Sequence, residues 1–147
     1  MITFERRPAG DSDLGSLLDA AFAELVVRYG PEGRSQVRDG ATFLLALLAG
    51  RAVGCGAMQP TGEHGVGELK RMFVLPEFRG RGIASAMLGS LEALAGELGY
   101  SVVRLATGDR QPEAIALYEK HGYLRIEPYG KYVNDPWSRC YQKQLAR

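Results

Sequence analysis

Hydrophobic residues follow two different spacings in the first part of the chain. Residues 2–7 alternate loosely between apolar and polar and predict a first strand, which Pro8 ends. The next segment keeps helical spacing, and Asp11 or Ser12 can cap it. Its apolar positions are Leu14, Leu17, Leu18, Ala21 and Leu25. A polar loop over residues 30–40 is expected to follow this helix.

Strand patterns dominate the middle of the chain. Residues 42–48 are apolar on both faces, as expected for a strand that is covered on both sides. A turn at Gly50 leads into a second strand over residues 52–58, which predicts a hairpin. A further strand over residues 68–75 ends at Pro76. Hairpins therefore come first in this chain.

Helices and strands alternate in the second half. A helix over residues 83–98 has one apolar stripe, and Gly99 follows at the position where helices commonly end. The remaining elements are a strand, a helix and two strands, at 101–106, 112–120, 123–126 and 138–145. Hairpins followed by strand–helix–strand units indicate an α+β fold with a mixed sheet. No linker interrupts the pattern, so we expect a single domain, residues 1–147.

Composition narrows the class of protein. The 147 residues carry a net charge of +1, with 46% hydrophobic and 24% charged residues, which suits one folded domain. So little net charge argues against nucleic acid as a partner. The longest apolar stretch, residues 41–49, is too short to cross a membrane. The cysteines, Cys55 and Cys140, and the histidines lack metal-type spacing, so no metal is expected. Without a signal-like N-terminus, we expect a cytoplasmic protein.

The segment Arg79-Gly80-Arg81-Gly82-Ile83-Ala84 carries the most specific candidate chemistry. It joins a predicted strand to the start of a predicted helix, where backbone N–H groups lack intrahelical partners and the helix dipole is positive. Its glycines let the backbone approach a phosphate, and its arginines add charge. The spacing fits neither a Walker loop nor a dinucleotide fingerprint. It predicts a site for a phosphorylated ligand, with a ligand-free surface turn as the alternative.

The spacing Arg-x-x-Gly-x-Ala resembles the Q/R-x-x-G-x-G/A pyrophosphate loop of the GNAT superfamily of N-acetyltransferases. Residues 68–79 resemble the fourth strand of that family, and residues 111–123 resemble its N-x-x-A-I-x-L-Y-x-x-x-G-F/Y signature. The likeness covers residues 40–145. Gln111 stands where the family usually has Asn, although Gln makes the same amide hydrogen bonds. Ala84 replaces a commoner Gly, which the pattern allows.

The resemblance implies a GNAT fold, in which a mostly antiparallel, twisted sheet has a splayed central strand pair and flanking helices. It implies acetyl-CoA as co-substrate. The pyrophosphate would bind the loop of Arg79, Gly80, Arg81, Gly82, Ile83 and Ala84, and Gln111 would also bind the cofactor. The backbone of Met72, Phe73 and Val74 would bind pantetheine while their side chains pack in the core. The Val74 N–H would face the acetyl oxygen.

The resemblance also assigns Tyr118 as the acid that protonates the leaving thiolate. The alternative for Tyr118 is a helix aromatic in the core. Tyr129, Tyr132 and Asp135 are candidates to line the acceptor pocket, with a plain surface loop as the alternative. Residues before 40 match the family only in outline, so the acceptor is the least defined part of the prediction.

Glu68 is the candidate base, because it is a carboxylate at the start of the cofactor-binding strand. Strand alternation places Glu68 on the same face as Met72 and Val74, unless a bulge lies near Gly67. The alternative roles are a solvated carboxylate and an ion pair with one of the basic residues that follow. A water chain is a further option for removing the proton of the amine.

These observations predict an acetyl-CoA-dependent N-acetyltransferase that acts on a primary amine, most simply of a small molecule, by direct attack in a ternary complex. An enzyme that acetylates protein N-termini or lysines is one alternative. A non-catalytic module that binds acyl-CoA is another. The sequence leaves the acceptor, the preferred acyl chain and the oligomeric state open, with a homodimer as one option.

Overall fold

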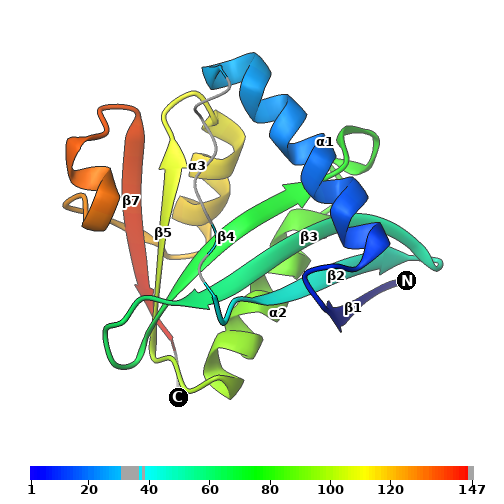
Figure 1. The fold of residues 1–147 in the computed structure, drawn as a ribbon, viewed down its shortest axis with the longest axis horizontal. Helices are drawn as coiled ribbons and strands as arrows, with labels where there is room; N and C mark the ends of the chain where they lie inside the picture. The colour runs from blue at the N-terminus through cyan, green and yellow to red at the C-terminus, as the bar shows by residue number, and fades with distance from the viewer. Residues whose placement is uncertain (31–36, 38, 146–147) are drawn as a thin grey trace.

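The computed structural model describes residues 1–30, 37 and 39–145. These residues form a seven-stranded sheet in the order β1-β2-β3-β4-β5-β7-β6, with helices on both faces (Figure 1). Only the β4–β5 pair is parallel, which confirms the predicted α+β fold with a mixed, mostly antiparallel sheet. The elements are β1 (Ile2–Arg7), α1 (Ser12–Tyr29), β2 (Thr42–Leu48), β3 (Arg51–Pro60), β4 (Val66–Val74), α2 (Ile83–Glu97), β5 (Val102–Gly108), α3 (Pro112–Lys120), β6 (Leu124–Ile126) and β7 (Ser138–Gln144).

The helices divide the core into two layers, one on each face of the sheet. On the α1 face, Leu14 and Leu17 of α1 pack against side chains of β2, β3 and β4. On the α2 face, α2 and α3 cover the larger layer. Its buried members include Leu44, Val53, Leu69, Val74, Met87, Leu91, Val103, Tyr118 and Tyr141. Each fully buried aliphatic side chain contributes about 1.5–3 kcal/mol, so both layers are needed for stability.

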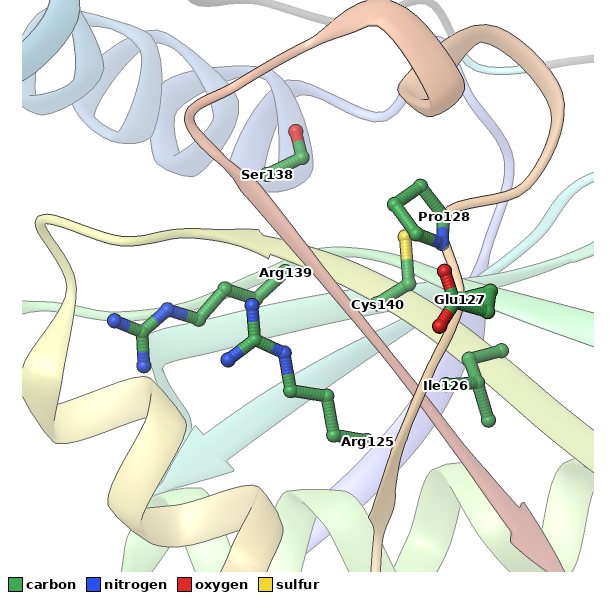
Figure 2. Close-up of a pocket in the computed structure, with 7 residues that line it drawn as sticks. All are labelled: Arg125, Ile126, Glu127, Pro128, Ser138, Arg139 and Cys140. Atoms are coloured by element: carbon green, nitrogen blue, oxygen red, sulfur yellow. The ribbon is translucent and has the colours of Figure 1, made fainter.

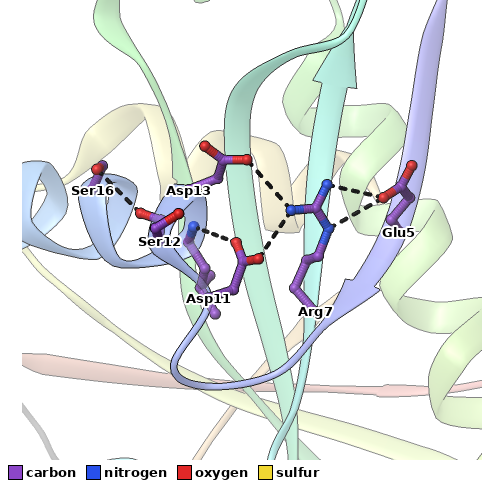
Figure 3. A network of polar contacts seen from close by, with 7 residues as sticks. Glu5, Arg7, Asp11, Ser12, Asp13 and Ser16 are labelled. Carbon is purple, nitrogen blue, oxygen red and sulfur yellow. Dashed lines mark hydrogen bonds and ion pairs between the residues drawn. The ribbon is translucent and has the colours of Figure 1, made fainter.

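Polar contacts fix the start of α1. Asp11 accepts a hydrogen bond from the Leu14 N–H at 3.0 Å and is the predicted helix cap. Arg7, at the end of β1, donates to Asp11 at 3.1 Å and to Asp13 and Glu5 (Figure 3). The Leu14 N–H and then the Arg7 guanidinium hold the pKa of Asp11 below its usual value. This network links the end of β1 to the start of α1.

A β-bulge interrupts β4. Ala57 pairs with Lys70 and Cys55 pairs with Phe73, so two residues of β4 lie opposite one residue of β3. Arg71, within the bulge, has φ +58°, the left-handed conformation that non-glycine residues rarely adopt. An extra residue on one strand exchanges the faces of all side chains that follow it.

The bulge overturns the expected placement of Glu68. Glu68 lies on the α1 face, as does Phe73 on the far side of the bulge. Met72 and Val74 pack on the α2 face. Glu68 therefore does not share a face with Met72 and Val74, because the bulge is at Arg71 and simple alternation does not hold across it.

The parallel pairing of β4 and β5 stops early. The paired residues are Val66 with Val102, Gly67 with Val103, and Glu68 with Arg104. Beyond them β5 stays with β7 as far as Gly108, and β4 stays with β3 (Figure 1). We call the separated parts, residues 69–74 and 105–108, the β4–β5 fork. It is the splayed strand pair that the resemblance implies.

Element boundaries differ from the expected ones by a few residues. α2 ends at Glu97, and β6 is shorter than expected. Between the predicted strands 123–126 and 138–145, the chain contains a short 3₁₀ helix, η2 (Gly130–Asn134). Much of the expected loop 30–40 lies outside the described residues. Among the described helices, none is long and apolar enough to cross a membrane.

Candidate active site

The backbone groups of β4 point in two directions at the fork. The Leu75 N–H donates to the Val53 carbonyl at 2.9 Å, so Leu75 faces β3. Directions alternate along a strand, so the N–H and C=O of Val74 point away from β3, into the fork. The same alternation directs the backbone of Phe73 to β3 and that of Met72 into the fork. Of the three residues expected to bind pantetheine, Met72 and Val74 present backbone groups to the fork.

The turn after β4 leaves the start of α2 open. Gly80 and Gly82 both have φ +79°, and a Cβ on either would meet no atom within 4 Å. In the described part of the chain, no side chain caps α2. The first N–H groups of the helix, from Ile83 onward, have no intrahelical acceptor by geometry. An anion that lies against these groups would also meet the positive end of the helix dipole.

The two arginines of this turn have different surroundings. Arg79 donates to the Val74 carbonyl at 2.9 Å and to Glu24 of α1 at 2.8 Å. Its guanidinium therefore links β4 to α1, and this side chain is directed away from the start of α2. Arg81 is exposed and lies over the ring of Phe78 at 5.2 Å. Arg81 is thus the arginine of this turn whose charge is available to a phosphate.

A polar cluster surrounds Glu68 on the α1 face, at the base of the fork. Glu68 is only 6% exposed. Its Oε2 accepts hydrogen bonds from the hydroxyls of Tyr129, at 3.0 Å, and Tyr132, at 3.2 Å, and its Oε1 accepts one from the Gln59 amide, at 2.8 Å. Lys70, 8% exposed, donates to the Tyr132 hydroxyl at 2.7 Å. These five residues form the Glu68 cluster.

The Glu68 cluster joins a carboxylate, two phenols and an ammonium group in one buried network. Burial, and next the nearby Glu68 carboxylate, raise the pKa of Tyr129, so its phenol stays protonated. Glu68 is neither solvated nor directly ion-paired in the described structure, so it matches neither simple alternative to a base. Asp135 does not join the cluster, because its carboxylate accepts from the Trp137 N–H and the Ser138 hydroxyl, both at 3.0 Å.

Tyr118 lies on the opposite face from the Glu68 cluster, within the layer under α2 and α3. Its ring meets Tyr123 edge-on, with centroids 5.7 Å apart. Burial raises the pKa of its phenol. Tyr118 is therefore a core aromatic whose hydroxyl stays protonated at neutral pH.

The end of α1 docks against the loop that follows β5. The Tyr29 hydroxyl accepts from the Arg110 N–H at 2.7 Å, and a Cβ on Gly108 would overlap this phenol. The Arg110 guanidinium lies over the rings of Tyr29 and Trp137 and donates to the Arg28 carbonyl at 2.8 Å. These contacts join α1, β5 and the segment before β7 beside the open end of the fork. Gln111, at the start of α3, interacts through its side chain with the Tyr29 hydroxyl.

Comparison with known proteins decides the family. Residues 13–123 match the model of the acetyltransferase (GNAT) family. The chain belongs to the GNAT acetyltransferase family. An IAA acetyltransferase of Azospirillum brasilense is 44% identical over 103 residues, which are 70% of this chain and 67% of that protein. A Klebsiella pneumoniae structure assigned as an acyl-CoA N-acyltransferase is 31% identical, with a TM-score of 0.85 and 99% of each chain covered.

As a GNAT acetyltransferase, the protein is an acyltransferase with acetyl-CoA as its co-substrate. A structure of a GNAT acetyltransferase from Elizabethkingia anophelis with acetyl-CoA bound has the same fold, with a TM-score of 0.75 and 98% of each chain covered. At 21% identity, it shows likeness of fold alone.

A cavity of about 420 Å³ lies apart from the fork, between β6 and β7 (Figure 2). Arg125, Arg139 and Cys140 are among its lining residues. In the sheet order, β5 and β7 separate this cavity from β4. Of its lining residues, Ser138 donates to Asp135 and Cys140 lies near Tyr129. The free edge of β4 and the open start of α2 are at the fork, so the fork and not this cavity is the candidate active site of the GNAT acetyltransferase.

Sequence reasoning missed part of the site. Gln59 and Lys70 carry no motif, and their role depends on Glu68 lying opposite Gln59 and on burial of Lys70. Tyr29 and Arg110 are in contact although 81 positions separate them in the sequence, so no local sequence pattern predicts the contact. Gln59 is a polar residue near the end of a largely apolar strand, which is the one available signal for it, whereas Lys70 lies among other charged residues of β4 and has no such signal.

Proposed function

We propose that this GNAT acetyltransferase transfers the acetyl group of acetyl-CoA to a primary amine of a small molecule, by direct attack in a ternary complex. The β4–β5 fork is the observation that carries the proposal. Its free β4 edge leads directly into the open start of α2, and its base holds the Glu68 cluster. The Azospirillum brasilense relative is named for acetylation of IAA, which favours a small-molecule acceptor.

On the donor side, the turn from Arg79 to Ala84 would hold the pyrophosphate with backbone N–H groups and the Arg81 side chain. The amides of pantetheine would then pair with the Met72 backbone and the Val74 N–H, in the position that a neighbouring strand would occupy, since the Val74 carbonyl already accepts from Arg79. This pairing sets the thioester close to Val74. Holding both substrates in one geometry supplies a large part of the rate acceleration in such reactions.

The bond changes follow from these positions. The neutral amine nitrogen attacks the thioester carbonyl carbon, and the carbonyl oxygen gains the negative charge, which the Val74 N–H stabilises. Collapse of this intermediate breaks the C–S bond and expels the CoA thiolate. Tyr118 gives its proton to the sulfur, since burial keeps its phenol protonated at neutral pH. The tyrosinate regains a proton from solvent after the products leave.

On the acceptor side, the amine would approach from the α1 face and lose its ammonium proton to the Glu68 cluster before attack. The cluster passes this proton to solvent and then takes the second nitrogen proton as the intermediate collapses to the amide. Glu68 accepts this proton directly or through the hydroxyl of Tyr129 or Tyr132, both of which donate to its Oε2. Glu68 and Tyr118 lie on opposite faces of the sheet. Base and acid therefore act on opposite sides of the thioester and do not exchange a proton with each other.

A screen of acceptors tests the proposed substrate class. The protein is incubated with acetyl-CoA and either small primary amines, peptides with free N-termini, or N-terminally blocked peptides with internal lysines. Release of the CoA thiol is measured. Small amines are expected to give the highest kcat/KM. A higher kcat/KM for peptides would contradict the proposal, as would acetyl-CoA binding without thiol release for every amine.

Tyr118→Phe tests the acid. The variant keeps the ring and its edge-on contact, so it should fold and bind acetyl-CoA like the parent, while kcat falls on the order of 10²-fold because the proton donor is lost. Because the pKa of the Tyr118 phenol is raised, the parent should show no loss of kcat from ionisation of this group up to about pH 10. Steady-state kinetics and calorimetry give these values.

Tyr123→Phe is the matched control for Tyr118→Phe. It removes a hydroxyl from the partner ring, and that hydroxyl donates to Glu92 at 2.9 Å. We expect lower stability with kcat unchanged. Equal kcat for Tyr118→Phe and the parent, with chemistry rate-limiting, would assign Tyr118 to packing alone.

Glu68→Gln tests the base. Turnover at neutral pH should fall by about 10²-fold, and the loss should shrink at alkaline pH, where more of the acceptor amine is already neutral. The measurement is kcat as a function of pH with a small-amine acceptor. Glu63→Gln is the control, because it neutralises an exposed carboxylate that pairs with Arg104 nearby. A loss of kcat that is the same at every pH would exclude Glu68 as the base.

A further inference from the structure

Cys55 of β3 lies against the β4 bulge. Its thiol donates a hydrogen bond to the Arg71 carbonyl at an Sγ–O distance of 3.4 Å. The side chain is completely buried. Burial raises the pKa of Cys55 to about 12, so the thiol is protonated at neutral pH and can donate.

The Arg71 carbonyl belongs to the strained residue of the bulge. With φ +58°, the Cβ of Arg71 is crowded by the backbone, a cost that glycine does not carry. Such a conformation persists only where surrounding contacts hold it. The thiol of Cys55 supplies one such contact, directly at the strained peptide.

Glycines flank Cys55 on both sides in β3. A Cβ on Gly54 would come within 2.9 Å of the Phe73 carbonyl, and a Cβ on Gly56 within 2.5 Å of Leu91. Gly54 therefore lets the β3 backbone lie close to β4 next to the bulge, and Gly56 lets α2 pack against the other face of β3. The thiol is the side-chain donor that reaches the bulge from this stretch of β3.

The bulge decides which backbone groups of β4 face the fork. If the bulge were lost, the residues of β4 that follow it would pair with β3 one position out of the present register. The backbone groups that now face β3 would then face the fork, and those that now face the fork would face β3. Val74 would then turn its N–H toward β3. The geometry of the proposed oxyanion donor thus depends on Arg71 keeping its left-handed conformation.

We propose that Cys55 is a positioning residue for acetyl transfer: its thiol holds the Arg71 carbonyl and so maintains the bulge that turns the Val74 N–H toward the thioester. This inference rests on the proposed function for the role of Val74. It assigns no chemical step to Cys55, whose sulfur touches neither substrate.

The test is a double-mutant cycle between Cys55 and Arg71. Cys55→Val fills the space without a donor, and kcat should fall on the order of 10-fold while KM for acetyl-CoA changes less. Cys55→Ser keeps a donor and should retain most of the kcat. In an Arg71→Gly background, Cys55→Val should cost much less, because glycine adopts the left-handed conformation without help. The cycle cancels whatever Arg71→Gly does by itself.

A second readout needs no acetyl transfer. Backbone NMR chemical shifts report whether residue 71 is left-handed, and Cys55→Val should move them away from the parent values while Cys55→Ser should not. If Cys55→Val does not fold, Cys55→Ala replaces it, and we expect the same fall in kcat and the same change in the chemical shifts of residue 71. Parent-like shifts at Arg71 in a Cys55→Val variant, or an equal kcat loss in both backgrounds, would overturn the proposal. Failure of the parent to acetylate any amine would count against the proposed function alone, since the NMR result still decides the role of Cys55.

Discussion

The end of the β4–β5 ladder after Glu68 and Arg104 is the constraint on which the site depends. β4 remains paired with β3 and β5 with β7, so the two halves of the sheet diverge as each keeps its own twist. The backbone N–H and C=O groups of β4 on the fork side then need partners other than a strand, and Arg79 supplies one to the Val74 carbonyl. A ligand with a chain of amides, such as pantetheine, supplies partners of the right kind, and the open start of α2 lies where its phosphates would follow.

The bulge at Arg71 gives the fork two chemically different sides. It leaves Glu68 and Lys70 on the α1 face, within a buried network of tyrosines, and it puts Val74 on the α2 face, where Tyr118 also lies. An amine and a departing thiolate have opposite needs, one losing a proton and the other gaining one. Separating the two faces lets a carboxylate and a phenol meet those needs without neutralising each other.

Local features were predictable from the sequence, and features that join distant segments were not. The turn from Arg79 to Ala84 and the helix after it were identified because glycine, arginine and apolar spacing lie within one short window. The bulge at Arg71 was not predicted, because Arg71 is not a glycine and no neighbouring residue indicates a positive φ at this position. The Glu68 cluster escaped in part because Gln59 and Lys70 acquire their role through strand pairing and through tyrosines that lie about 60 positions away.

Amide hydrogen exchange, measured residue by residue by NMR with and without acetyl-CoA, tests most directly the claim that the fork holds the donor. Val74 and the first residues of α2 should exchange at least about tenfold more slowly in saturating acetyl-CoA, because new hydrogen bonds must open first. Phe73 faces β3 in either state and serves as the internal reference. Slower exchange at Ile83 and Val74 together, with Phe73 unchanged, is the predicted result. Binding of acetyl-CoA without any slowing at Val74 would contradict the account.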